Sequence, residues 1–231
     1  MHSAIRVGLV GDWNEQQKAH GAIPKALDRA SKGQIEAVWV ATDSVGKTLV
    51  EFDGLWCVPG MPYRSADGVL HAIRHARVTH TPFLGTSAGF QYALIEFARN
   101  VLGLADADHQ KTNPAAQVPL VSKLDAALVG VRSRVRFTSG TVVRRAYGVA
   151  EAMEEYRCSF GLNPRYRRLV AGPLTVSAVD DQDEVRAVEL DGHPFFVATL
   201  FQPEMNEASP LVGAFVAACT RHIQVRAKAA S

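Results

Sequence analysis

In the first half of the chain, short apolar runs alternate with longer segments whose apolar residues recur at helical spacing. The short runs are typical of buried strands, and the longer segments predict the helices that follow them. We expect strands at 5–11, 35–41, 55–58 and 82–85, and helices at 19–32, 66–79 and 90–102. This alternation predicts an α/β fold in which helices cover both faces of a mostly parallel sheet.

The pattern changes after about residue 125, where apolar and polar residues alternate with a period of two. Such alternation favours strands with one buried face, and polar turn-like segments at 180–184 and 191–192 separate them. We expect an antiparallel extension of the sheet, followed by a closing helix. The predicted strands are 128–137, 141–145, 174–179, 185–190 and 195–201, and the predicted helix is 210–226.

No repeat or linker divides the sequence, so residues 1–231 are interpreted as one domain. The content of 47% hydrophobic and 21% charged residues is that of an ordinary globular protein. The net charge of +2 is too small to indicate nucleic-acid binding. No apolar run is long enough to span a bilayer, and three scattered cysteines give no disulfide pattern. We therefore expect a cytoplasmic protein without a nucleic-acid or membrane partner.

The histidines are scattered and show no metal-ligand spacing, so neither a metal nor another cofactor is expected. The most informative segment is instead 81–103, T-P-F-L-G-T-S-A-G-F-Q-Y-A-L-I-E-F-A-R-N-V-L-G. A short buried strand leads through G-T-S-A-G directly into a helix, which is the context of a nucleophile elbow. Such a turn would hold Ser87 in a strained position, beside the free N–H groups of a helix N-terminus.

This segment resembles the nucleophile segment of class I glutamine amidotransferases, and most closely that of the glutaminase domain of CTP synthases. Segments 53–64, 154–166 and 191–204 resemble the oxyanion loop, the glutamine-carboxylate loop and the histidine–glutamate segment of the same domain. The resemblance covers nearly the whole chain. It implies a three-layer α/β/α sandwich and a pocket that includes Gly60 and Gln91.

Members of this family hydrolyse glutamine with a cysteine nucleophile, a histidine base and a glutamate that orients the histidine. The resemblance places Ser87 at the cysteine position, Gln202 at the histidine position and Glu204 at the glutamate position. A serine hydroxyl stays protonated near neutral pH and therefore depends strongly on a base. The Gln202 amide cannot take up that proton, so we expect no glutamine hydrolysis by the family mechanism.

The positions that bind glutamine in the family also differ here. Its carboxylate-binding arginine corresponds to Ser159, which removes a charge-assisted contact. Its acid, which holds the amino group of glutamine, corresponds to Lys111 in a loop beyond the helix. The oxyanion donors correspond to the N–H groups of Met61 and Ala88. We expect Pro62 to hinder rotation of the Met61 amide, because it restricts Met61 to extended conformations.

Our leading hypothesis is a divergent member of this family that binds another small molecule at Ser87. One alternative is a hydrolase or transferase with Ser87 or Cys158 as nucleophile, where Arg157 would favour a Cys158 thiolate in a pocket loop. A partly buried, inert Cys158 is the simpler interpretation. Another alternative is a residual glutaminase that supplies ammonia to a separate synthetase. A homo-oligomer is a further expected form of assembly.

Overall fold

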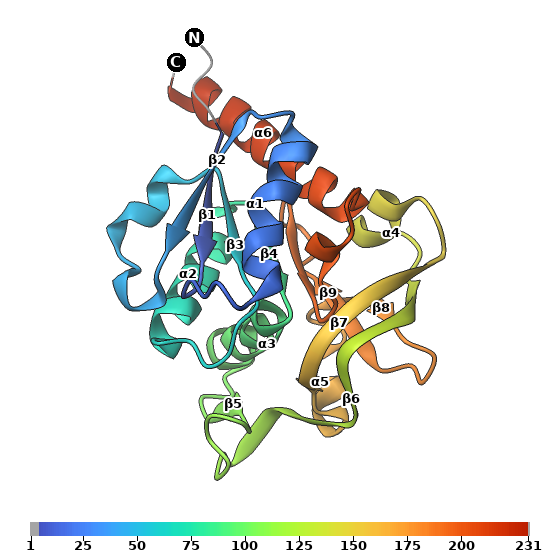
Figure 1. The fold of residues 1–231 in the computed structure, drawn as a ribbon. Coiled ribbons are helices and arrows are strands. Elements are labelled where there is room, and N and C mark those ends of the chain that lie inside the picture. Colours follow the sequence, from blue (N-terminus) through green and yellow to red (C-terminus); the bar gives the residue numbers. More distant parts are fainter. Residues whose placement is uncertain (1–4, 231) are drawn as a thin grey trace.

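The structure is a computed structural model that describes residues 5–230. One ten-stranded sheet runs through it in the order β2-β1-β3-β4-β10-β9-β8-β6-β5, with β7 paired to β6 (Figure 1). The strands are β1 (Ile5–Val10), β2 (Ile35–Val40), β3 (Gly54–Cys57), β4 (Phe83–Thr86), β5 (Ala107–His109), β6 (Val118–Phe137), β7 (Glu151–Leu162), β8 (Thr175–Val179), β9 (Val185–Glu189) and β10 (Phe196–Thr199).

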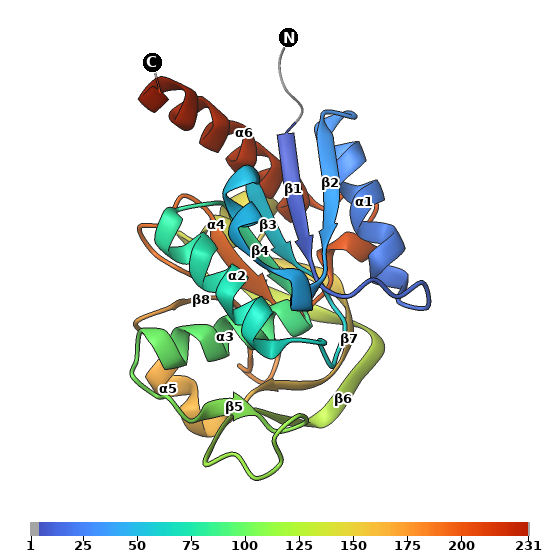
Figure 2. The ribbon, with the colours of Figure 1, turned by 90° about the vertical axis from the view of Figure 1, so that its left-hand side faces the viewer.

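Helices cover both faces of the parallel part of the sheet. Helices α1 and α6 lie together on one face, and α2 and α3 lie together on the other (Figures 1 and 2). The helices are α1 (Lys18–Ser31), α2 (Ala66–Thr79), α3 (Ala88–Asn100), α4 (Val142–Tyr147), α5 (Arg167–Val170) and α6 (Pro210–Ala230). Four short 3₁₀ turns occupy Thr42–Ser44, Lys47–Glu51, Pro164–Tyr166 and Pro203–Met205. None of the helices described is both long and apolar enough to cross a membrane.

The parallel half contains strands β2, β1, β3, β4 and β10, in register with one another. Every residue of β3, β4 and β10 is buried, because helices pack on both faces of these strands. Aromatic contacts join sheet and helix and also neighbouring strands. Trp56 meets Phe215 of α6 edge-on at 5.9 Å between ring centroids, and Phe83 of β4 stacks on Phe196 of the adjacent β10 at 4.5 Å. The sequence prediction of a helix-covered, mostly parallel sheet is confirmed.

The antiparallel extension is also confirmed, but three of its strands differ from the prediction. The strand predicted at 195–201 is β10, which pairs parallel with β4 and so belongs to the parallel half. Strands β9, β8 and β6 pair antiparallel after β10, and β7 forms a long antiparallel ribbon with β6. Strand β6 starts at Val118, ten residues before the predicted start at 128. Strand β7 was not predicted, because its charged residues interrupt the apolar alternation that marks a strand. Cys158 therefore lies in a strand and not in a loop.

The predicted strand at 141–145 is wrong, because these residues belong to the start of helix α4. The β-branched residues favoured a strand, but capping contacts decide the local structure. The Thr141 side chain accepts a hydrogen bond from the N–H of Arg144 at 3.1 Å. The buried Glu189 carboxylate accepts the N–H of Val142 at 2.9 and 3.0 Å. These contacts satisfy the free donors of the first turn, as N-caps do.

The parallel strands end at a common edge of the sheet, and this edge positions the candidate site. Ligands of open α/β sheets bind outside the carboxyl ends of the strands. Here β3 is followed by Pro59 and Gly60, β4 by Ser87, and β10 by Gln202. The β7 strand is tied to this edge, because the N–H of Gln202 donates to the carbonyl of Glu155 at 2.8 Å.

Candidate functional site

Ser87 lies in a sharp turn between β4 and α3, at residues 85–89, which we call the Ser87 turn. Its φ of 53° and ψ of −102° are rarely adopted by residues other than glycine. The conformation is held from both sides: the N–H of Ser87 donates to the carbonyl of Thr199 at 2.8 Å, and its carbonyl accepts the N–H of Gln91 at 3.2 Å. Strain of this kind costs about 1–3 kcal/mol and persists only where surrounding contacts enforce it.

The two glycines of the Ser87 turn allow strand and helix to approach closely. A Cβ atom on Gly89 would lie 2.2 Å from the carbonyl oxygen of Cys57, and one on Gly85 would lie 2.9 Å from the backbone of Gly89. Neither position accepts a side chain without displacing backbone. Glycine at both positions is therefore what allows the close contact between strand and helix.

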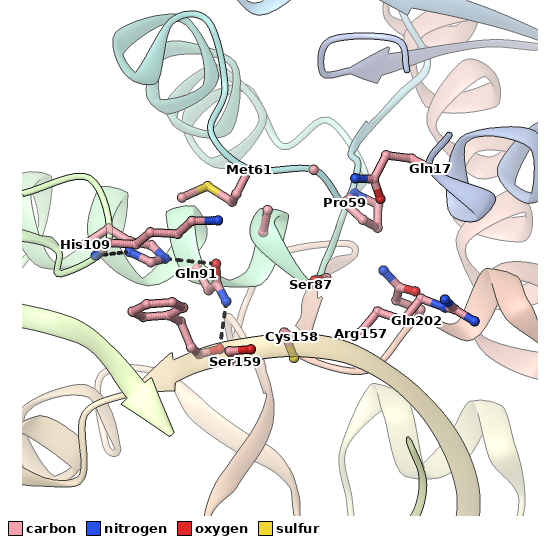
Figure 3. A pocket seen from close by; sticks show the side chains of 14 residues that line it. Gln17, Pro59, Met61, Ser87, Gln91, His109, Arg157, Cys158, Ser159 and Gln202 are labelled. Carbon is pink, nitrogen blue, oxygen red and sulfur yellow. Dashed lines mark hydrogen bonds between the residues drawn. The ribbon is translucent and has the colours of Figure 1, made fainter. Parts of the chain in front are cut away.

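A cavity of about 210 Å³ opens above the Ser87 turn, and we call it the Ser87 pocket (Figure 3). All predicted site residues except Glu204 line it: Gly60, Met61, Ser87, Ala88, Gln91, Lys111, Cys158, Ser159 and Gln202. Figure 3 shows Gln91 and His109 on one side of Ser87, and Gln202 and Arg157 on the other. The structure thus brings together residues from five separate parts of the chain.

On the first side, a chain of hydrogen bonds connects three elements. The backbone N–H of Lys111 donates to Nδ1 of His109 at 3.0 Å, and Nε2 of His109 lies 3.1 Å from Oε1 of Gln91. The Gln91 amide nitrogen donates to the carbonyl of Phe160 at 2.7 Å. Since Nδ1 accepts, Nε2 must carry the proton, and the imidazole is neutral. Burial, together with the Lys111 charge, lowers the pKa of His109 to about 4.

A second imidazole lies behind the loop that follows β3. Nδ1 of His20 accepts the N–H of Asn14 at 3.0 Å, and Nε2 lies 2.6 Å from the carbonyl oxygen of Pro59. Both ring nitrogens are therefore used to hold the 59–60 loop, whose Gly60 has a φ of +130°. Burial lowers the pKa of His20, which keeps this ring neutral as well.

On the other side of Ser87, at Gln202 and at Glu204 beneath the pocket lining, buried polar atoms lack partners. Oε1 of Gln202 and Oε2 of Glu204 form no hydrogen bond with any described residue. The other Glu204 oxygen accepts only a long bond, 3.4 Å, from the Thr86 hydroxyl. Burial raises the pKa of Glu204 to about 8, so this carboxyl is protonated at neutral pH. The Ser87 hydroxyl forms no hydrogen bond to an imidazole or carboxylate of residues 5–230.

Cys158 lines the pocket but lies in an environment that opposes a thiolate. Its Sγ donates to the carbonyl of Leu200 at 3.8 Å, and burial raises the pKa of the thiol to about 12. The neighbouring Arg157 turns to Glu155, donating to one carboxylate oxygen at 2.8 and 2.6 Å. The structure therefore supports the simpler interpretation of Cys158 as a buried thiol.

Sequence reasoning missed four residues that line the Ser87 pocket: Gln17, Pro59, His109 and Phe160. His109 had no motif around it, and its place follows from β5, a three-residue strand too short to show alternation. Its proximity to Lys111 was the one available signal. Among the described residues, no group of three or more acidic, histidine or cysteine side chains forms a potential metal site.

Known proteins with similar sequences identify the family of this chain. The sequence profile described as "Glutamine amidotransferase class-I" matches residues 23–209. CTP synthase of Aeropyrum pernix is 34% identical over 94% of this chain and 45% of its own length, and CTP synthase of Staphylococcus saprophyticus is 32% identical over 95% and 45%. The chain spans less than half the length of these curated relatives.

Solved structures show the same fold. The glutaminase domain of Trypanosoma brucei CTP synthase, with bound acivicin, superposes with a TM-score of 0.86 at 23% identity, over 94% of both chains. A glutamine amidotransferase of Thermotoga maritima gives a TM-score of 0.60 at 13% identity, over 93% of this chain and 83% of that one. With the profile match over most of the sequence, these findings show that the chain belongs to the class I glutamine amidotransferase family.

Proposed function

We propose that this protein binds a small molecule other than glutamine at the Ser87 pocket and does not hydrolyse glutamine. The observation that carries the proposal is the environment of the Ser87 hydroxyl, which has no imidazole or carboxylate partner among residues 5–230. Attack by serine on an amide requires a base that takes its proton in the transition state. Both nearby imidazoles are engaged at both ring nitrogens, so neither is available.

Glu204 supports the same conclusion. In the family mechanism, a glutamate orients the histidine base, and it must be ionised to do so. Here the corresponding carboxyl faces no imidazole and is held protonated by burial. The three positions Ser87, Gln202 and Glu204 thus form a degenerate triad in this proposal.

The substrate contacts argue against glutamine as well. Ser159 stands where the resemblance places the carboxylate-binding arginine, and Lys111 stands where it places the acid for the amino group. Both residues line the Ser87 pocket. Glutamine would meet a cation with its ammonium group and lose the charge-assisted bonds to its carboxylate, each worth about 1.5–3 kcal/mol.

The direct test is release of ammonia from L-glutamine by the purified protein, measured with a coupled dehydrogenase assay. We expect no release above that of a Ser87→Ala variant. Release that depends on Ser87 would refute the proposal. The assay is repeated with the amidoligase part of a CTP synthase added, because the relatives are more than twice as long as this chain. Ammonia produced only in that mixture would support a residual glutaminase that serves a separate synthetase.

Restoring the triad sharpens this test. We expect the double variant Ser87→Cys with Gln202→His to remain inactive on glutamine, because Lys111 and Ser159 are unchanged. The matched control adds Lys111→Glu and Ser159→Arg to the same double variant. Activity of the double variant alone would show that Lys111 and Ser159 do not decide substrate binding.

A second candidate function is a hydrolase or transferase in which Ser87 is the nucleophile. The strained backbone of Ser87 favours it, since strain of this kind gathers at functional sites. A fluorophosphonate probe followed by peptide mass spectrometry tests it, with Ser87→Ala as control. Labelling at Ser87 would support catalysis, whereas an unlabelled protein that is stabilised by its ligand would support binding alone. Labelling of Cys158 by iodoacetamide would favour the thiol as nucleophile.

A further inference from the structure

The charges of the Ser87 pocket differ in kind from those that a zwitterionic amino acid needs. Lys111 and Arg157 line the pocket, and none of the described residues lining it is an aspartate or a glutamate. Arg157 is already paired with Glu155 at 2.6 Å. Lys111 forms no ion pair with any carboxylate of the described chain. The pocket therefore holds one uncompensated cation and offers no anionic partner for an ammonium group.

The backbone holds Lys111 at the pocket. Its N–H is bonded to His109, which is connected through Gln91 to α3 and to β7. The segment carrying Lys111 is thus attached to the wall of the pocket. Since His109 is neutral, the side-chain charge at this end of the pocket comes from the Lys111 ammonium.

The opposite end contains an independent sign of a missing ligand. The Gln202 side chain is 2% exposed and lines the pocket, yet its buried Oε1 accepts no hydrogen bond from the described residues. A buried acceptor without a partner costs about 1–3 kcal/mol, so such atoms normally have one. Between the two ends, the first turn of the 13-residue helix α3 presents N–H donors and its positive dipole at Ser87.

We propose that the Ser87 pocket binds a short carboxylate that has no ammonium group, with its carboxylate at Lys111 and a polar oxygen-bearing end at Ser87 and Gln202. The inference rests on the proposed function and names its ligand class. The carboxylate pairs with the uncompensated cation, the far oxygen accepts from the N-terminus of α3, and an amide or hydroxyl donor at the same end of the ligand bonds to Oε1 of Gln202. An α-amino acid is disfavoured, because its ammonium group would lie beside Lys111 without an acidic partner.

Three closely matched probes test the ligand class by isothermal titration calorimetry. Glutaramate is glutamine without its α-amino group, and glutarate replaces the remaining amide by a second carboxylate. We expect glutaramate to bind at least about tenfold more tightly than L-glutamine, a difference of about 1.4 kcal/mol. Glutarate is also expected to bind more tightly than L-glutamine. Equal or tighter binding of L-glutamine would overturn the proposal, as would failure of both carboxylates to bind.

Charge reversal at Lys111 tests the position of the carboxylate. We expect Lys111→Glu to weaken glutaramate binding by at least about tenfold, and Lys111→Met to weaken it less. The matched control is Lys25→Glu, which changes the net charge equally at an exposed position of α1 outside the pocket. Gln202→Leu should weaken binding without affecting the preference for glutaramate over glutamine. Unchanged binding in Lys111→Glu, or an equal loss in Lys25→Glu, would refute the assignment.

The ammonia assay and the binding measurements test the proposed function and the ligand class separately. Ammonia release from glutamine would refute the proposed function whichever probe binds. Absence of ammonia together with no binding of glutarate or glutaramate would refute only the ligand class. The folded state of each variant is checked by its thermal unfolding, so a loss of binding is not confused with a loss of structure.

Discussion

The two sides of the Ser87 pocket differ in how completely their polar groups are satisfied. On the side of Gln91 and His109, each ring nitrogen and each side-chain amide atom has a partner. On the side of Gln202, with Glu204 behind the pocket lining, buried oxygens have none. Because native proteins normally satisfy buried polar groups, the first side is built for rigidity. The second side retains polar residues that only a ligand or a lost catalytic partner would explain.

The largest effect is expected on the satisfied side, in His109→Ala. This change leaves the Gln91 oxygen and the Lys111 N–H without partners and creates a cavity at a fully buried position. We expect the free energy of unfolding to fall by about 3 kcal/mol, measured by urea denaturation. His71→Ala on the exposed face of α2 is the control. A loss no larger than that of the control would contradict the view that this side is rigid.

The same residue predicts a pH dependence. The folded protein keeps His109 neutral with a pKa of about 4, whereas the unfolded chain protonates it near pH 6.5. Its contribution to stability is therefore complete above about pH 6.5 and is lost as the pH falls towards 4. The difference in unfolding free energy between wild type and His109→Ala should shrink over this range. A constant difference would show that His109 has the same pKa in the folded and the unfolded protein.

A smaller effect of opposite sign is expected on the unsatisfied side, in Glu204→Gln. The folded protein holds Glu204 protonated with a pKa of about 8, whereas the unfolded chain ionises it near 4.5. Wild type therefore loses stability as the pH rises between these values, and glutamine does not. We expect the variant to be more stable by about 2 kcal/mol at pH 7, with the gain growing towards pH 8. Glu207→Gln, at an exposed position, serves as control; parallel pH profiles in both variants would contradict the assignment.

The smallest effect concerns Ser87, between the two sides. Its positive φ suits glycine, so Ser87→Gly should relieve strain and raise the free energy of unfolding by about 1 kcal/mol. The gain should be accompanied by a loss of probe binding, because the hydroxyl is removed. Thermal unfolding and calorimetry measure the two effects. Destabilisation by Ser87→Gly would show that the hydroxyl forms contacts that stabilise the fold.

The sequence predicted most of the fold because the parallel half follows simple rules. Strands β1, β3 and β4 are short apolar runs, and the helices after them have regular apolar spacing. The errors lie where local chemistry overrides pattern. Residues 141–145 are β-branched and basic, yet capping by Thr141 and Glu189 makes them helical. Strand β7 shows no clear apolar alternation, because charged residues occupy both of its faces: Arg157 is exposed and paired with Glu155, whereas Glu154 is buried and accepts from the Tyr147 hydroxyl.

The candidate site was predictable in its residues but not in its chemistry. The resemblance brought Ser87, Lys111 and Ser159 to one pocket, where the structure places them. Sequence could not show that His109 is buried and neutral, because its pKa is lowered mainly by burial, which arises only in the folded chain. Nor could it show that Arg157 turns to Glu155 and leaves Cys158 as a buried thiol. Burial and side-chain direction are properties of the assembled fold.

The joining of distant segments at the sheet edge has a consequence for folding. The walls of the pocket come from the chain after β3, after β4, within β7 and after β10, so most of the polypeptide must be in place before the cavity exists. High contact order of this kind makes assembly cooperative and comparatively slow. A molecule that binds in the cavity therefore stabilises the whole folded protein against global unfolding. Slowed hydrogen exchange should therefore reach amides of β1 and α6 as well as those at the pocket.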